Sequence, residues 1–367
     1  MPVVVDQICR HLIAQGDEAA VVTYRGDEIP DREELPYPVY SLRIGNRPTI
    51  SAIRRFYQHL DEFQPDIIHD HYGGLWSALL LYHPVWQKRA IHHVHNEYKI
   101  IPGSPDQRRP LRTNLFLKRL LPRYPQIFTV SSAVKEHLLE LSPVKEQQIQ
   151  IQYNAIDKSY FLKTKSRKSY PDTRKELDLT GYDMVIGAVG RFVYEKGMDL
   201  VINVLNELRS DGVEAAAILA GDGDQEYIRE VRKKSQELGV IDHCRFTGRV
   251  DNTADYFRAM DIFMFCSRQE PFGLTLLEAM ASEVPIIAMK TKYGGGTSEI
   301  IRNMENGILT EFEDIQSLAQ SCLKLKNNSE LKTRLVDGGS KTVEKQFDLR
   351  RRFEEIRIAY NIFLSEK

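Results

Sequence analysis

Residues 270–281 read EPFGLTLLEAMA, a glycine-containing turn followed by an apolar helical pattern. They come directly after residues 262–266, an apolar run that predicts a buried strand. The stretch therefore predicts a strand, a tight loop and a helix, with Glu270 and Gly273 at the carboxyl edge of a parallel sheet. Open α/β folds bind their ligands at that edge.

The same alternation of short apolar runs and helical patterns extends in both directions, and it predicts two doubly wound, Rossmann-like α/β domains. The expected strands are 19–24, 39–42, 67–70, 91–95, 127–130 and 149–153 in the first half, and 185–190, 217–221, 245–248, 262–266, 286–289 and 307–310 in the second. We expect a first domain at 1–160, a polar linker at 161–182, a second domain at 183–346, and a C-terminal helix at 347–367 that crosses back to the first domain.

The N-terminus departs from this plan. Residues 3–14 carry apolar side chains at helical spacing, and Pro2 suits the first turn of a helix. A doubly wound domain normally begins with a strand and a glycine-rich turn. We therefore expect that the first strand is either missing from this sequence or truly absent from the sheet, and we favour the former.

The composition excludes several classes of protein. The 367 residues are 42% hydrophobic with a net charge of −1, which suits two buried cores and argues against nucleic-acid binding. Four widely spaced cysteines support neither a disulfide framework nor a zinc ribbon. No apolar run reaches the ~20 residues of a membrane span and no signal peptide opens the chain, so we expect a cytoplasmic protein.

Two further loops could bind phosphate. Residues 190–197, which follow a predicted strand, contain Arg191 and Lys196 between two glycines, and residues 294–299 read GGGTSE. Loop cations are usually just solvated, and a lone glycine run is weak evidence. Together with the helix that begins after Gly273, however, these loops share one sheet edge and predict a phosphate-rich donor site.

Glu270 and Glu278 are eight residues apart around the start of that helix. They could hold hydroxyl groups at opposite ends of one ligand, a sugar at Glu270 and a ribose at Glu278. An ordinary structural explanation stays equally open, because a loop acid is often solvated and an acid early in a helix complements the helix dipole.

These motifs resemble the retaining family-4 glycosyltransferases of GT-B fold. The resemblance rests on residues 190–197, on Glu270 and Glu278, on the glycines before Glu299, and on residues 129–133 and 153–157. It implies transfer of a sugar from a UDP- or GDP-linked donor to a hydroxyl group of a saccharide, lipid-linked or small-molecule acceptor, with retention at the anomeric carbon. It also implies a role in polysaccharide, glycolipid or glycoconjugate biosynthesis, without a cofactor or a metal ion.

The resemblance assigns a role to each matching residue. Arg191 and Lys196 would contact the donor diphosphate, Glu278 the ribose and Glu270 the transferred sugar, while His95 would contact the sugar or the acceptor. The remaining donor-binding residues would be Gly190, Phe272, Gly273, Leu274 and Thr275. Ala155 stands where the family commonly has glycine.

Two pairs of histidines end predicted strands of the first half. Alternation along a strand places His69 and His71 on one face, and likewise His93 and His95. Such a group could hold zinc in a hydrolase. The resemblance favours His95 as the residue that lines the cleft, a structural role is favoured for most of the others, and no metal is expected.

A basic, amphipathic segment spans residues 104–123. Its candidate contacts with an anionic membrane or a phosphorylated acceptor are Arg108, Arg109, Arg112, Lys118 and Arg119. The alternative is an ordinary helix whose leucine face packs in the core and whose arginine face is exposed to solvent. Peripheral attachment to the inner face of a membrane is therefore an additional expectation.

Three other functions remain open. A sugar-nucleotide epimerase would share the donor site but use no acceptor, and a non-catalytic scaffold would bind a sugar nucleotide without turnover. A nicotinamide oxidoreductase is disfavoured, because the first half has no G-x-G-x-x-G motif after a strand.

Overall fold

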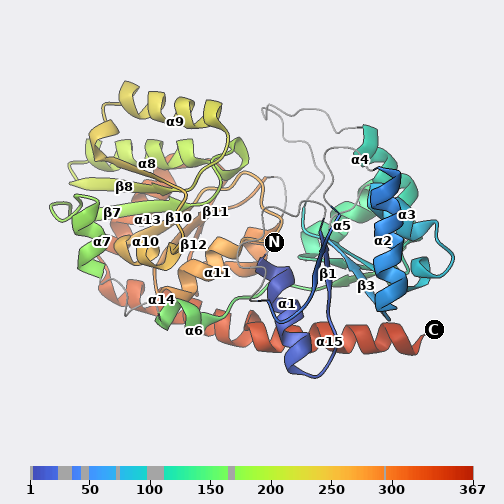
Figure 1. Ribbon diagram of the computed structural model, residues 1–367. Helices are drawn as coiled ribbons and strands as arrows, with labels where there is room; N and C mark the ends of the chain where they lie inside the picture. Colours follow the sequence, from blue (N-terminus) through green and yellow to red (C-terminus); the bar gives the residue numbers. More distant parts are fainter. Residues whose placement is uncertain are drawn as a thin grey trace.

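The computed structural model describes residues 3–23, 35–42, 49–71, 75–96, 111–163, 170–292 and 295–366. It contains two α/β domains side by side, and a long C-terminal helix extends from the second domain along the first (Figure 1). The predicted fold class is therefore confirmed.

The second domain is built on one continuous parallel sheet. Its strands are β7 (Met184–Val189), β8 (Ala215–Ala220), β9 (Cys244–Gly248), β10 (Ile262–Phe265), β11 (Ile286–Met289) and β12 (Ile308–Thr310). They lie in the order β12-β11-β10-β7-β8-β9, so the chain direction across the sheet reverses between β7 and β10. Ligands bind at such a switch point in doubly wound folds.

Helices cover both faces of this sheet because successive residues of a strand point to opposite sides. On β7, Met184 and Ile186 belong to one hydrophobic cluster and Val185 to another. The first cluster includes residues of α8 (Met198–Ser210), α9 (Gln225–Glu237) and α13 (Ile315–Lys326), and the second includes residues of α10 (Thr253–Ala259), α11 (Leu274–Ala281) and α14 (Ser329–Gln346). The short helix α12 (Gly296–Ile300) precedes β12.

The described strands of the first domain form two separate parallel sheets. One contains β1 (Val21–Thr23) and β2 (Val39–Ser41), and the other contains β3 (Ile68–Asp70), β4 (Ala90–Val94), β5 (Gln126–Thr129) and β6 (Ile149–Ile151) in that order. Their helices are α1 (Val3–Ala14), α2 (Ile50–Phe63), α3 (Leu75–Leu81), α4 (Leu111–Leu115) and α5 (Ser132–Leu141). The helix predicted at residues 3–14 is thus confirmed.

The polar segment between the domains is partly helical. It contains α6 (Lys158–Lys163) and α7 (Tyr170–Glu176). The Arg174 guanidinium anchors α7 to the second domain, since it donates to the Ala259 carbonyl at 2.8 Å and pairs with Asp261 at 2.8 Å. Polar composition alone therefore did not distinguish a loop from a docked helix.

Helix α15 (Leu349–Ser365) joins the two domains at its start. Just before it, the Ile156 amide donates to the Phe347 carbonyl at 3.1 Å, and the Leu349 amide donates to the Ile156 carbonyl at 3.2 Å. Further along α15, Phe353 and Tyr360 pack in one apolar cluster with Ile8 of α1 and with strands β4 and β5.

Candidate active site

Lys196 and Glu270 meet at the switch point of the second sheet. Lys196 lies in the loop after β7, and Glu270 lies in the loop after β10. The Lys196 Nζ donates to Glu270 Oε2 at 2.6 Å, and the Ser267 hydroxyl donates to the same oxygen at 3.3 Å. The Glu270 side chain is only 8% exposed, so each residue of this pair compensates the other's charge away from bulk water.

The loop after β10 continues into the N-terminus of α11. Gly273 has φ +108°, in the left-handed region that favours glycine, and a Cβ there would lie 2.9 Å from Leu276 Cδ1. The half-buried Leu274 and Thr275 follow as the first helical residues. The first N–H groups of a helix have no partner inside it and attract anions, so this turn could bind a phosphate.

Phe272 anchors the same loop to the interface between the domains. Its side chain is buried, with ring centroids 6.0 Å from Tyr153 and 5.7 Å from Phe347. Packing of the ring leaves the backbone of this turn as the part that can approach a ligand.

The loop after β7 is pressed against the end of β10. Gly197 has φ +63°, and a Cβ there would lie 2.0 Å from the Cys266 carbonyl oxygen, so only glycine fits. Gly190 begins the loop, and its amide donates to the Ala220 carbonyl at 2.9 Å. Arg191 is exposed, and within the described residues its guanidinium has no hydrogen-bond or ion-pair partner. This cation is therefore available to a ligand.

Arg268 is a positioning residue that no sequence motif indicated. It is 4% exposed, and its guanidinium donates to both carboxylate oxygens of Asp199 at 2.8 and 2.9 Å and to Glu313 at 2.5 Å. It also donates to the Tyr194 carbonyl at 2.8 Å, inside the loop that carries Lys196. The network fastens the loops after β7 and β10 to each other and to the start of α8.

Glu278 lies on α11, within reach of α10. Thr253 donates to its Oε2 at 3.3 Å. Burial raises the pKa of the Glu278 carboxyl to about 7, against a small opposing effect of the Thr253 hydroxyl. A carboxyl group with this pKa can accept hydrogen bonds from hydroxyls when ionised and donate one when protonated.

Glu299 links the two domains, a role that no sequence motif indicated. The glycine run before it lies against the active-site loop, since the Gly296 amide donates to the Glu270 carbonyl at 3.2 Å. The Glu299 carboxylate accepts from the amides of Ser132 and Ala133, both at 3.1 Å, at the N-terminus of α5 in the first domain. The segment predicted to bind phosphate therefore places the Glu299 carboxylate at the N-terminus of α5. Gly294 lies outside the described residues.

His95 follows β4 at the edge of the first domain. Its Nε2 lies 2.8 Å from Nδ1 of His71. Burial, together with the nearby His92, lowers the pKa of His95 to about 4, so its ring is uncharged at neutral pH. The predicted pairing of faces is confirmed, because the rings of His69 and His71 are 4.1 Å apart and those of His93 and His95 are 4.2 Å apart.

The basic segment at residues 104–123 is only partly buried in its described part. Phe116 and Leu117 are buried, whereas Leu111 and Leu115 are 85% and 57% exposed. Lys118 and Arg119 are exposed on the same segment. Arg108 and Arg109 lie outside the described residues, as does the side chain of Arg112.

Solved structures of other proteins share this architecture. Sucrose-phosphate synthase from Thermosynechococcus elongatus superposes with a TM-score of 0.82 at 21% identity, over 99% of this chain and 93% of that one. Anabaena HepE, in complex with UDP and glucose, superposes with a TM-score of 0.80 at 20% identity, over 97% and 95%. Two Rossmann-like domains joined by a C-terminal helix in this way define the GT-B class of fold.

Sequence matches narrow the class to a family. The family description "Glycosyltransferase Family 4" matches residues 1–160, and "Glycosyl transferases group 1" matches residues 169–342. The chain belongs to the family-4 glycosyltransferases, as its motifs predicted.

Among curated relatives is the lipopolysaccharide core biosynthesis glycosyltransferase LpsE of Rhizobium meliloti, 30% identical over 194 residues, which are 53% of this chain and 53% of the relative. The capsular polysaccharide biosynthesis glycosyltransferase CapM of Staphylococcus aureus is 26% identical over 65% of this chain and 62% of its own length. The chain thus spans about half the length of the first relatives it matches. No helix in the described part of the chain is both long and apolar enough for a bilayer crossing.

Proposed function

We propose that this protein transfers a sugar from a UDP- or GDP-linked donor to a hydroxyl acceptor, with retention of anomeric configuration and without a metal ion on the donor diphosphate. The observation that carries the proposal is the Lys196–Glu270 pair, 2.6 Å apart at the switch point and beside the N-terminus of α11. The relatives named for lipopolysaccharide and capsule synthesis support a role in polysaccharide biosynthesis.

The donor diphosphate would lie between Arg191, Lys196 and the first turn of α11. Arg191 would supply a planar cation, Lys196 a point charge, and the helix end aligned N–H groups. Together these charges would stabilise the leaving diphosphate, which is the role a metal ion plays elsewhere. The departing phosphate would accept the proton of the attacking hydroxyl on the same face of the sugar, so no side chain forms a covalent intermediate.

The carboxyl groups of Glu270 and Glu278 would bind opposite ends of the donor. Glu270 is held in place by Lys196 and would accept a hydrogen bond from a sugar hydroxyl, while Glu278 would receive the ribose hydroxyls. In the first domain, His95 would meet the sugar or the acceptor as an uncharged ring. Ordering of both domains around the donor would exclude water and limit hydrolysis.

Turnover of UDP-glucose and GDP-mannose by the full chain tests this proposal. Arg191→Ala and Lys196→Ala should each lower kcat by roughly 30- to 1000-fold, equal to about 2–4 kcal/mol of barrier. Lys233→Ala, a change of a lysine that is 75% exposed on α9, is the matched control and should retain normal turnover. Near-normal rates in both active-site variants would remove these cations from the mechanism.

Product analysis separates the alternatives. A transferase releases nucleoside diphosphate and a new glycoside of unchanged anomeric configuration, whereas an epimerase converts the donor without an acceptor. Binding of UDP- or GDP-sugars, detected as a rise in Tm, without turnover of any donor would instead indicate a scaffold.

We also propose that the segment from Leu111 to Arg119 touches an anionic membrane surface that carries the acceptor. Two exposed leucines next to two exposed cations form the amphipathic pattern that such surfaces attract. Sedimentation with vesicles of phosphatidylglycerol and phosphatidylcholine should capture the protein and should capture less of a Lys118→Glu, Arg119→Glu variant. Equal capture of both proteins would refute membrane contact through this segment.

A further inference from the structure

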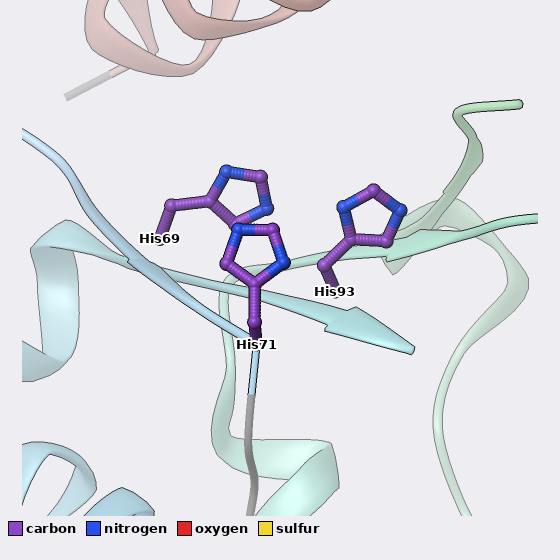
Figure 2. Close-up of side chains that lie close together, drawn as sticks. All are labelled: His69, His71 and His93. Carbon is purple, nitrogen blue, oxygen red and sulfur yellow. The ribbon is translucent and has the colours of Figure 1, made fainter. Parts of the chain in front are cut away.

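Four imidazole rings are packed together where β3 and β4 end in the first domain. His69 belongs to β3, His71 follows it, and His93 belongs to β4; Figure 2 shows these three rings grouped on one side of the strands. His69 and His93 stack with ring centroids 5.2 Å apart, and His71 and His93 lie 5.3 Å apart. The fourth ring, His95, adjoins His71.

The hydrogen bonds of these rings leave nitrogens unused. The Nδ1 of His69 lies 2.5 Å from the Tyr360 hydroxyl, and its buried Nε2 has no hydrogen-bond partner among the described residues. Neither nitrogen of the buried His93 has a partner within that part of the chain. His71 contacts His95 through Nδ1, and Nε2 is its other nitrogen. Buried polar atoms are normally paired, so an unpaired set of this kind calls for a ligand.

The chemistry of the group selects the kind of ligand. All three side chains offer imidazole nitrogens, and none of them offers an oxygen. Uncharged imidazole nitrogens are the ligands of zinc and related ions, whereas calcium and magnesium require oxygen. The nearest carboxylate of β3, Asp70, is engaged by the hydroxyls of Ser77 and Tyr124.

We propose that His69, His71 and His93 bind one zinc ion. One nitrogen from each ring already lies within 4.8 Å of the others. Two nitrogens on a tetrahedral zinc are about 3.4 Å apart, given zinc–nitrogen bonds of about 2.0–2.1 Å, so binding requires the nitrogens to approach one another by up to about 1.4 Å.

The site is distinct from the donor site of the second domain. The Tyr360 hydroxyl, on α15, orients the His69 ring from outside, as the outer partners of zinc-bound histidines commonly do. Zinc on Nε2 of His71 would leave the proton on Nδ1, and that proton would be donated to His95. The ion would thus set the tautomer of His95 without contacting the donor diphosphate.

Equilibrium dialysis of the full chain against zinc chloride, after removal of metals with a chelator, tests the proposal. We expect one tight zinc ion per chain and a Tm that rises with zinc concentration. His93→Gln should weaken this zinc binding by at least ~10-fold. His243→Gln, which removes a histidine of the second domain bonded to Tyr182, should bind zinc like the parent protein. Equal losses in both variants, or no tight zinc in the parent, would overturn the proposal.

A measurement on the parent protein covers the case in which His93→Gln fails to fold. X-ray absorption of the zinc-loaded chain counts the imidazole ligands of the ion directly. Three imidazoles are expected. Fewer than three, or any thiolate, would place the ion elsewhere and refute this site.

Discussion

The two domains present different chemistry to each other. The second has one unbroken sheet, and buried ion pairs around Arg268 and Glu270 lock the loops at its switch point. The described strands of the first form two sheets, and its edge carries a stack of uncharged imidazoles. The difference teaches that the cations proposed to bind a diphosphate lie on the domain whose loops are fastened by ion pairs, while the facing edge of the first domain offers imidazole rings.

We expect the largest effect from Arg268→Ala, which would remove the hydrogen bonds and ion pairs that hold the loops after β7 and β10 together. Removing the guanidinium leaves Asp199 and Glu313 without their shared partner, and breaking a buried pair of this kind costs about 3–5 kcal/mol of unfolding free energy. Urea unfolding measures the change. Arg351→Ala, at a side chain that is 60% exposed on α15, is the control and should cost less than about 1 kcal/mol. A loss of similar size in both variants would mean that the network does not hold the loops.

An intermediate effect is expected from Glu278→Gln, and it should depend on pH. Burial raises the pKa of the Glu278 carboxyl in the folded protein to about 7, above its value in the unfolded chain. The carboxyl therefore ionises at lower pH in the unfolded chain than in the folded protein. As a result, the free energy of unfolding falls as pH rises from about 4.5 to 7. The substitution should therefore stabilise the protein by about 1–3 kcal/mol more at pH 8 than at pH 4.5. Unfolding curves at both pH values measure this difference.

The control for this variant is Glu237→Gln, since Glu237 is 63% exposed at the end of α9. It should change stability equally at the two pH values. If Glu278→Gln behaved in the same way, burial would not be raising the pKa of Glu278.

The smallest expected effect belongs to the contact between the domains. Glu299→Gln keeps one acceptor but removes the charge that binds the amides of Ser132 and Ala133, at a cost of about 1 kcal/mol. Hydrogen exchange of these two amides should become up to ~10-fold faster. Glu136→Gln, an exposed position on the same helix α5, should leave their exchange unchanged. Unaltered exchange in Glu299→Gln would show that the carboxylate does not hold the two domains together.

Much of the second domain could be predicted from the sequence, because its signals are local. Gly273 and Gly197 sit where a Cβ would collide with neighbouring atoms, and such glycines mark tight loops in the sequence itself. The apolar runs of β7 and β10 bound those loops, so the sequence predicted that both loops lie at one sheet edge. The ion pair between Lys196 and Glu270 was not predicted, because it depends on β7 and β10 being neighbours in the sheet.

The residues that escaped prediction act over long distances in the sequence. Arg268 is 69 positions from Asp199, and Glu299 is 167 positions from Ser132. A single arginine or glutamate in a loop carries no local signal of such a partner. The helix α7 was missed for a similar reason, since only its docking on Ala259 and Asp261 distinguishes it from a polar linker.

The two backbone hydrogen bonds at Ile156 affect how the two domains can move relative to each other. The chain passes between the domains beside Ile156 and again at Phe347 to Leu349, and backbone hydrogen bonds tie these two passages together. These two hydrogen bonds hold the crossing segments together where the chain passes between the domains, in addition to the Glu299 contact. We therefore expect a rotation of one domain about this place to keep both bonds, whereas sliding of the domains past each other would break them.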